Sequence, residues 1–184
     1  DITDRKRAEE QLLYLTSYDS LTGLYNRSYF WQMMIQLDNG RHDPVGIIVC
    51  DLDGLKLVNN TVGHKIGDTL IAAAARVIKS CFREDDIVAH IGGDEFAILM
   101  LNTPQWAVEN ACHRIRRAVQ RYNADGPDIP LSLSIGFAVH DSTKIRMDEV
   151  FEIADSQMYR DKLNNSQAAR VAIVQALMRF LNDN

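Results

Sequence analysis

Two pairs of acidic residues stand within apolar stretches of this 184-residue sequence, where carboxylates are costly to bury. One pair ends VGIIVCDLD and the other interrupts IVAHIGGDEFAILML; they are Asp51 with Asp53 and Asp94 with Glu95. A buried carboxylate is unfavourable unless it is paired or bound to a metal ion. If the two stretches are neighbouring strands, their acids converge on a divalent cation, and Mg²⁺ prefers such oxygens together with substrate phosphates. The pattern therefore predicts phosphoryl or nucleotidyl transfer with two metal ions.

Two glycines, Gly92 and Gly93, stand directly before the second acidic pair. Because glycine has no side chain, a bulky phosphorylated ligand can approach the backbone closely there. The alternative is an ordinary hairpin whose acids point into solvent, and an isolated GGDE tetrapeptide would favour that alternative. The upstream stretch DLDGLK supplies the other pair of acids, Asp51 and Asp53, and shifts the balance towards a site.

The hydrophobic pattern predicts the elements that must position these acids. Helices are expected over 4–16, 27–37, 67–82, 103–122 and 147–164, and strands over 45–54, 87–91, 95–101 and 130–139. Residues 59–67 are expected to form a polar turn, and Thr103 to cap the helix that follows it. Glycines between two short apolar runs predict a β-hairpin. The order of elements predicts an α/β fold of the α+β type, with a central, mostly antiparallel sheet flanked by helices.

Composition and charge narrow the class of protein. A net charge of −5 argues against a general nucleic-acid binder, which would show a basic face, so no nucleic-acid polymer is expected as a partner. The three cysteines are scattered without metal-binding spacing, which favours reduced thiols in a cytoplasmic domain. No apolar run is long enough to span a bilayer. Because the chain begins with Asp rather than Met, we expect it to be part of a longer protein.

Five motifs in order resemble those of the GGDEF domain, the diguanylate cyclase family, over residues 17–165. They are DSLTGLYNR at 19–27, DLDGLKLVNNTVGHKIGD at 51–68, GGDEF at 92–96, SIG at 134–136 and ADSQMYRDK at 154–162. The resemblance implies a fold like that of nucleotidyl cyclases and the polymerase palm, a ferredoxin-like architecture. It also implies that two GTP condense to cyclic di-GMP and two pyrophosphates, assisted by Mg²⁺ or Mn²⁺. Each of two antiparallel GGDEF domains would hold one GTP, so a homodimer is expected.

The resemblance assigns roles to the acids and glycines. It implies a metal site made of Asp51, the backbone carbonyl of Leu52, Asp94 and Glu95. Asp94 and Glu95 are also expected to be catalytic, and Glu95 would bind metal or help to activate the attacking 3′-hydroxyl. The alternative for Glu95 is a purely structural acid. Gly92 and Gly93 would lie against the phosphates and ribose.

Substrate binding is assigned to residues beside these acids. The implied set is Leu55, Lys56, Asn59, Asp68 and Lys162. Asn59 and Asp68 would recognise guanine, because a carboxylate accepts hydrogen bonds from the N1–H and N2–H₂ edge and an amide serves the rest. Lys56, which is also expected to be catalytic, and Lys162 would neutralise the triphosphate. Outside the motif, either lysine would be an ordinary solvated residue. Leu55 takes the place of a usual Phe.

A product-binding inhibitory site is also implied. Arg83 and Asp86 fit the family's RxxD motif upstream of the signature, with Arg114 as a partner on the helix after the hairpin. An arginine can stack on guanine and bond its edge, and an aspartate can accept from it. Because RxxD is a weak pattern, a simple polar turn is the alternative.

The sequence departs from the family pattern at three positions that bear on activity. His90 stands where Arg is usual, and Asn60 stands where Asp is usual. Ser166 replaces an Arg that would contact the triphosphate, and the loss of such a charge-assisted bond costs about 1.5–3 kcal/mol. Asp19 and Asp53 also lie in the motifs, where packing or turns explain them as easily as chemistry.

The flanks predict the domain organisation. Residues 1–16 are expected to be a signalling or linker helix after a PAS-like sensor, 17–165 the GGDEF domain, and 166–184 a C-terminal helix leading to an HD-GYP-like domain.

One alternative to an active cyclase is a weak or inactive module that binds GTP or cyclic di-GMP and regulates an adjacent phosphodiesterase domain. His90 and Ser166 favour it. A structural dimerisation relay is the third interpretation, which the intact acids disfavour.

Overall fold

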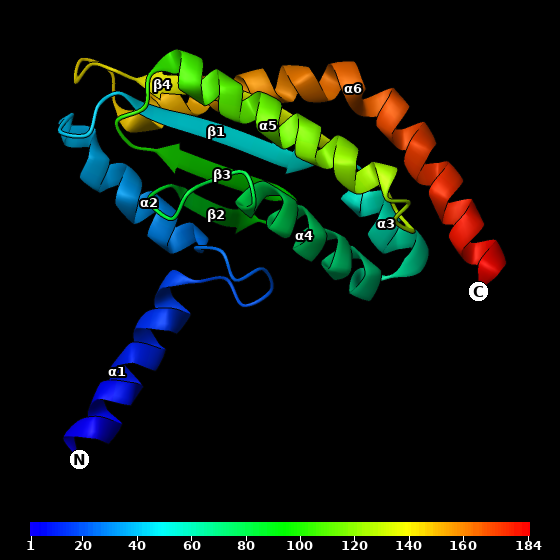
Figure 1. Ribbon diagram of the computed structural model, residues 1–184, viewed down its shortest axis with the longest axis horizontal. Helices are drawn as coiled ribbons and strands as arrows, with labels where there is room; N and C mark the ends of the chain where they lie inside the picture. The colour runs from blue at the N-terminus through cyan, green and yellow to red at the C-terminus, as the bar shows by residue number, and fades with distance from the viewer.

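An antiparallel sheet and the helices packed on it form most of the chain. The computed structural model describes residues 1–184, apart from the side chains of residues 13–15 in the expected linker helix. The elements are α1 (Ile2–Ser17), α2 (Arg27–Gln36), η1 (Leu37–Asn39), β1 (Val45–Leu52), α3 (Leu55–Val62), α4 (His64–Lys79), β2 (Ile87–Gly92), β3 (Glu95–Met100), α5 (Gln105–Ala124), β4 (Leu133–His140) and α6 (Met147–Asp183). Helix α1 projects away from the sheet (Figure 1). None of the helices in the described part of the chain is long and apolar enough to cross a membrane.

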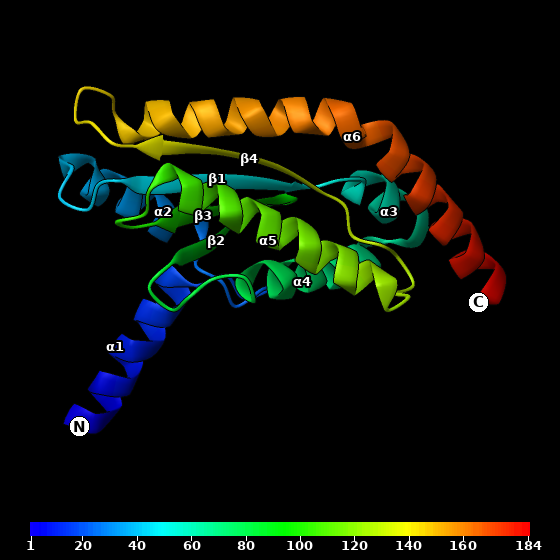
Figure 2. The same ribbon diagram turned by 45° about the horizontal axis from the view of Figure 1, so that its top comes forward.

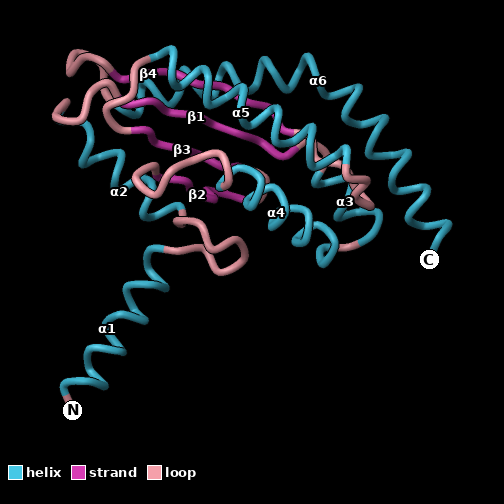
Figure 3. Tube along the Cα trace, in the orientation of Figure 1, coloured by secondary structure: helices cyan, strands magenta, loops and turns pink.

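The four strands form one sheet in the order β2-β3-β1-β4, and every neighbouring pair is antiparallel. Strand β1 is central and buried along its whole length, as its continuous apolar run requires. Its alternate residues face different cores. Ile48 and Cys50 pack with α4 and α5, whereas Ile47 and Val49 pack with α2 and the first part of α6. The predicted antiparallel sheet flanked by helices is confirmed (Figure 3).

Helix α6 is a single long helix that contributes to both cores. Its first part adds Ala154 and Met158 to the core shared with α2, and its second part adds Ile173 and Leu177 to the core shared with α4 and α5. The helix therefore runs along β4 at the edge of the sheet, and it bends midway before it passes α3 (Figure 2). The segment beyond residue 165 is thus packed on the domain and continues the same helix.

The outer edge of β4 is covered by side chains of α6. The backbone N–H of Ile135 donates to Asp161 Oδ2 at 2.8 Å, and that of Phe137 donates to Gln157 Oε1 at 2.6 Å. Between them, Gly136 lies so close to α6 that a Cβ there would fall 2.2 Å from backbone atoms of that helix. These bonds occupy N–H groups at the edge of β4, so this edge is protected from pairing with another strand. They also hold α6 against β4, next to β1, which carries Asp51.

Residues 59–67 are almost entirely helical, so the predicted polar turn is wrong. Helices α3 and α4 cover this segment, and only Gly63, with a φ of 94°, separates them. Leu55 and Val58 stand at helical spacing and are buried in the core. Burial of this apolar face outweighs the weak helix propensity of the neighbouring asparagines.

The predicted N-cap of α5 is also wrong. The Thr103 hydroxyl donates instead to the carbonyl oxygen of Leu101 at 2.8 Å, and Pro104 stands at the N-cap position. Proline suits the start of a helix because it has no N–H, and the first N–H groups of a helix have no partner within it.

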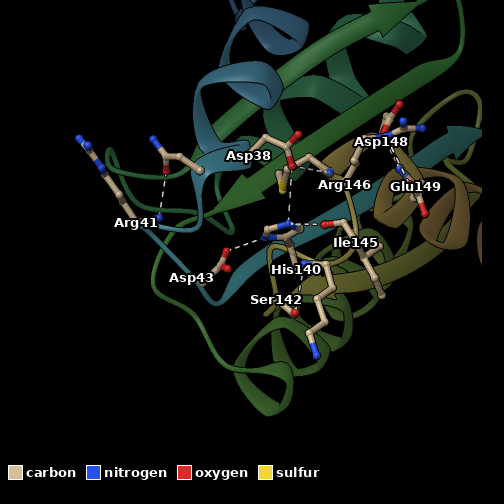
Figure 4. Close-up of polar contacts among 12 residues, drawn as sticks. Asp38, Arg41, Asp43, His140, Ser142, Ile145, Arg146, Asp148 and Glu149 are labelled. Atoms are coloured by element: carbon tan, nitrogen blue, oxygen red, sulfur yellow. Dashed lines mark hydrogen bonds and ion pairs between the residues drawn. The ribbon is translucent and has the colours of Figure 1, made fainter.

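A buried histidine joins the elements at the end of the sheet remote from the acids (Figure 4). Nδ1 of His140 lies 2.6 Å from Asp43 Oδ1, and Nε2 lies 2.8 Å from the carbonyl oxygen of Ile145. Both ring nitrogens therefore have an oxygen within hydrogen-bond distance. Asp38 Oδ1 lies 3.7 Å from Nε2 and accepts from the backbone N–H of Met147. The ring thus connects the end of β4 to the loop before β1 and to the start of α6.

Candidate active site

The two acidic pairs meet where β1 and β3 run side by side. Asp51 on β1 is paired with Glu95 on β3, and the backbone N–H of Leu52 donates to the carbonyl oxygen of Asp94 at 2.7 Å. The predicted hairpin is present, with its turn at Gly93 and Asp94. Residues that lie far apart in the sequence therefore form one acidic edge.

Burial and mutual repulsion raise the pKa of these acids. Asp51 is only 5% exposed, and its burial and the charge of Asp94 raise its pKa to about 6, although Lys162 opposes the shift. Lys162 Nζ lies 2.7 Å from Asp51 Oδ1. Burial, then the charges of Asp155 and Asp94, raise the pKa of Glu95 above its usual value. The site therefore holds more negative charge than its one paired lysine neutralises.

Glycines 92 and 93 are not required by the packing of the hairpin. A Cβ on Gly92 would lie 3.8 Å from the nearest atom, Oε2 of Glu95, and a Cβ on Gly93 would meet no described atom within 4 Å. Neither residue has a positive φ. Because backbone geometry and packing both tolerate a side chain at these positions, the glycines are best explained by a ligand that approaches the backbone beside the acids.

A cleft of 620 Å³ opens beside the acidic edge. It is lined by Asp51, Glu95, Asp155, Ser156, Met158, Tyr159, Arg160 and Lys162. Asp155 was not singled out from the sequence, although it lies in the ADSQMYRDK motif. Asp155 lies on the same helix as Lys162 and lines the same cleft. The helical spacing of the two residues within 147–164 is the sequence signal that could have identified Asp155.

The acids fit a divalent cation by their chemistry. In the described part of the chain, no three acidic, histidine or cysteine side chains already converge as a metal-binding cluster. Asp51, Asp94 and Glu95 nevertheless offer hard oxygen donors on one edge. Burial, and then the repulsion between neighbouring acids, raises the pKa of Asp51 and of Glu95, and a bound cation would offset both causes. These three side chains, with the carbonyl of Leu52, are the residues that would hold Mg²⁺.

Asp53 has a structural role. Its carboxylate accepts hydrogen bonds from the hydroxyls of Ser132 at 2.7 Å and Ser134 at 2.8 Å, and it is 4% exposed. Both bonds tie the end of β1 to the segment that enters β4. Of the two acids in DLD, Asp51 lines the acidic cleft, whereas Asp53 connects the end of β1 to the start of β4.

The two predicted guanine-binding residues stand on adjoining helices. Asn59 lies on α3 and Asp68 is exposed on α4. The side-chain oxygen of Asn59 is buried without a hydrogen-bond partner among the described residues, and a Cβ on Gly67 would fall 1.7 Å from it. A buried unpaired acceptor is unfavourable, so a ligand donor at this point would be stabilising. Leu55 is buried in the core, which leaves only its backbone to meet a ligand.

His90 connects the signature turn to the segment after α1. Its Nδ1 lies 3.0 Å from Asp19 Oδ2 and its Nε2 lies 2.9 Å from the carbonyl oxygen of Gly93. Burial raises the pKa of Asp19, but hydrogen bonds from Thr22 and His90 outweigh burial and hold this pKa below its usual value. His90 therefore supports the turn that carries Asp94.

The predicted inhibitory residues gather at the other end of β2. The backbone N–H of Arg83 donates to Asp86 Oδ2 at 3.0 Å, and Nε of Arg114 donates to the carbonyl oxygen of Cys81 at 3.4 Å. All three thus adjoin the turn between α4 and β2, at the start of β2, whereas the GGDEF signature begins at the other end of β2. The guanidinium of Arg83 is exposed, as a ligand-binding arginine requires.

Comparisons with known proteins identify the family. The model of the GGDEF domain family, described as diguanylate cyclase, matches residues 16–168. Diguanylate cyclase DgcM of Escherichia coli K12 is 34% identical over 169 residues, which are 88% of this chain and 40% of that protein. Cyclic di-GMP phosphodiesterase PdeR of the same organism is 34% identical over 164 residues, 88% of this chain and 25% of that protein. The chain thus spans less than half of either relative.

A solved structure shares the same fold. The crystal structure of the GGDEF domain of DgcB from Caulobacter crescentus in complex with c-di-GMP superposes with a TM-score of 0.71 at 27% identity. The match covers 80% of this chain and 91% of that one. Together with the intact signature on the β2–β3 hairpin, these findings show that the chain belongs to the GGDEF domain family of diguanylate cyclases.

Proposed function

We propose that this chain condenses two GTP into cyclic di-GMP and two pyrophosphates. The observation that carries the proposal is the pairing of Asp51 with Glu95 beside two glycines that the fold does not require. Mg²⁺ or Mn²⁺ would be held by the acidic edge, where it would supply charge neutralisation at the transferring phosphate. The similarity to DgcM supports the reaction.

The residues around the cleft have distinct roles in this proposal. Asn59 and Asp68 would hold the guanine, and Lys56 and Lys162 would bind the triphosphate. Glu95, whose pKa is raised by burial, is a stronger proton acceptor than an exposed carboxylate and would help to activate the 3′-hydroxyl. Because one chain presents one such site, two copies facing each other would be needed to join two GTP.

A regulatory module is the second candidate. In that case the chain would bind GTP or cyclic di-GMP without turnover and would control an adjoining phosphodiesterase domain. Two observations favour it: Ser166 stands where an arginine is usual, and a protein named as a phosphodiesterase matches 88% of this chain. PAS-like and HD-GYP-like neighbours belong to the same proposal.

An assay of the products separates the two candidates. The chain is incubated at high concentration with GTP and Mg²⁺, which favours pairing of the domains, and the products are separated by chromatography. The wild type is expected to form cyclic di-GMP, and Asp94→Ala is expected to form none. Asp125→Ala, which removes an exposed acid at the end of α5, is the matched control and should match the wild type. GTP binding by calorimetry without product would instead support the regulatory module.

Product inhibition is tested at Arg83. We expect added cyclic di-GMP to inhibit the wild type and to inhibit Arg83→Ala at least about tenfold less strongly, because the variant loses a charge-assisted contact to the guanine edge. Turnover without added product should be similar in both, since Arg83 lies away from the acidic edge. Equal inhibition of the two proteins would favour the polar-turn interpretation of residues 83–86.

A further inference from the structure

A second cleft, of 570 Å³, lies between α3 and the second part of α6. Three cationic side chains line it, Lys56, Lys162 and Arg170, together with the polar side chains of Asn60 and Ser166. Lys162 also lines the acidic cleft, so the two clefts adjoin at this lysine. Arg170 lines the second cleft and is not among the residues that line the acidic cleft.

Cationic side chains outnumber acids among the residues that line the cleft, although the protein carries a net charge of −5. Asp53 is the one acid among the lining residues, and its carboxylate is already engaged by Ser132 and Ser134. Among the described residues, neither Lys56 nor Arg170 makes an ion pair. Unpaired cations that face one cleft are the arrangement that binds phosphate groups.

The packing of α6 holds Arg170 at this place. Lys162, Ser166 and Arg170 follow one another at four-residue spacing, so they lie along one face of the helix. Just beyond them, Ile173 is buried against the turn between β1 and α3, where a Cβ on Gly54 would fall 2.4 Å from its Cδ1. Arg170 is therefore carried by a well-packed segment, and Ser166 leaves room between the two cations.

The start of α3 adds an independent feature that favours anions. Gly54 and Lys56 line the cleft, and Gly54 is the N-cap of α3 without a side-chain hydrogen bond to the helix. The first backbone N–H groups of a helix have no partner within it, and together with the helix dipole they attract phosphate. The cleft thus combines backbone donors with three cations.

We infer that Arg170 binds the GTP triphosphate, at the phosphates farther from the acidic edge, together with Lys56 and Lys162. The inference rests on the proposed function for the identity of the nucleotide. It makes the helical segment beyond residue 165 part of the substrate site. Arg170 thereby supplies, one helical turn further along α6, the guanidinium that is missing at position 166, where Ser166 replaces the usual arginine.

The test compares nucleotides that differ only in their phosphates. Binding of GTP and of GMP, each with Mg²⁺, is measured by calorimetry for the wild type, Arg170→Ala and Arg170→Lys. Arg179→Ala, which removes an exposed arginine of α6 outside the cleft, is the matched control. We expect Arg170→Ala to weaken GTP binding about tenfold. GMP binding should change little, Arg170→Lys should weaken GTP less, and the control should match the wild type.

The outcomes distinguish this inference from the cyclase proposal, because binding is measured without turnover. Wild-type protein that binds GTP but forms no cyclic di-GMP would defeat the cyclase proposal and leave the comparison at Arg170 decisive. Unchanged GTP binding in Arg170→Ala would overturn the inference, as would equal weakening of GTP and GMP. Absence of GTP binding in the wild type would overturn it as well. Thermal unfolding checks that the variants remain folded.

Discussion

Replacing Asp51 with asparagine is expected to abolish formation of cyclic di-GMP and, in the absence of metal, to stabilise the chain at neutral pH. The loss of turnover should be about a hundredfold or more, because the variant removes the most buried charge of the acidic edge, at the point where phosphoryl charge would be neutralised. The gain in stability has a separate cause, which is the cost of keeping that charge in a buried position.

The direction of the pH dependence follows from the pKa of Asp51. Burial raises this pKa from 3.8 to about 6 in the folded chain, so between these values the folded state binds the proton more tightly than the unfolded state. The stability due to protonation is present below about pH 4 and is lost as the pH rises through about 6. The shift corresponds to at most about 3 kcal/mol, and residual solvent screening reduces this to about 1–3 kcal/mol.

Urea unfolding of the wild type and Asp51→Asn at pH 4 and pH 7.5, without metal, measures this difference. Relative to the wild type, the variant should gain about 1–3 kcal/mol in free energy of unfolding between the two pH values. Asp125→Asn, an exposed acid at the end of α5, should gain nothing. Mg²⁺ should stabilise the wild type at pH 7.5 and not the variant. If the difference in free energy of unfolding between Asp51→Asn and the wild type is the same at both pH values, Asp51 ionises as freely in the folded chain as in the unfolded one.

Gly136→Ala is expected to lower the free energy of unfolding by about 2–3 kcal/mol, a large effect for one added methyl group. The added Cβ would fall 2.2 Å from the carbonyl oxygen of Ala154 and from the backbone nitrogen of Met158. Because both atoms belong to the backbone of α6, no side-chain rotation relieves the contact, and the helix itself must move. Since α6 carries Lys162, GTP binding should also weaken.

Gly93→Ala is the matched control for this prediction. The same added methyl group would meet no described atom within 4 Å at Gly93, and the backbone there is not in a left-handed conformation. Its free energy of unfolding should stay within about 0.5 kcal/mol of the wild type, while GTP binding weakens because the methyl group fills the approach to the acids. Urea unfolding and calorimetry of both variants make the comparison. Similar stability of the two variants would contradict the proposed seating of α6.

Local patterns in the sequence were sufficient for much of the fold. The alternation of apolar runs with glycines predicted the β2–β3 hairpin, and the apolar run at 45–54 predicted a buried strand, because hydrophobic periodicity directly reports which residues are buried. The segment 59–67 was mispredicted because its asparagines and glycines resemble a turn. Its helices depend on Leu55 and Val58 of α3, and on Leu70 and Ile71 of α4, entering a core that other elements build.

The sequence by itself determined which residues are proposed to carry the chemistry, because charged residues within apolar runs are costly and are retained where a site needs them. Five ordered motifs then identified the family. Only the tertiary structure decided how those residues divide their roles. Asp53 holds Ser132 and Ser134, while Asp51 faces Lys162 across a long sequence separation. The contact between Asp51 and Lys162 depends on how α6 docks against β4, and docking is set by packing between distant segments that no local pattern records.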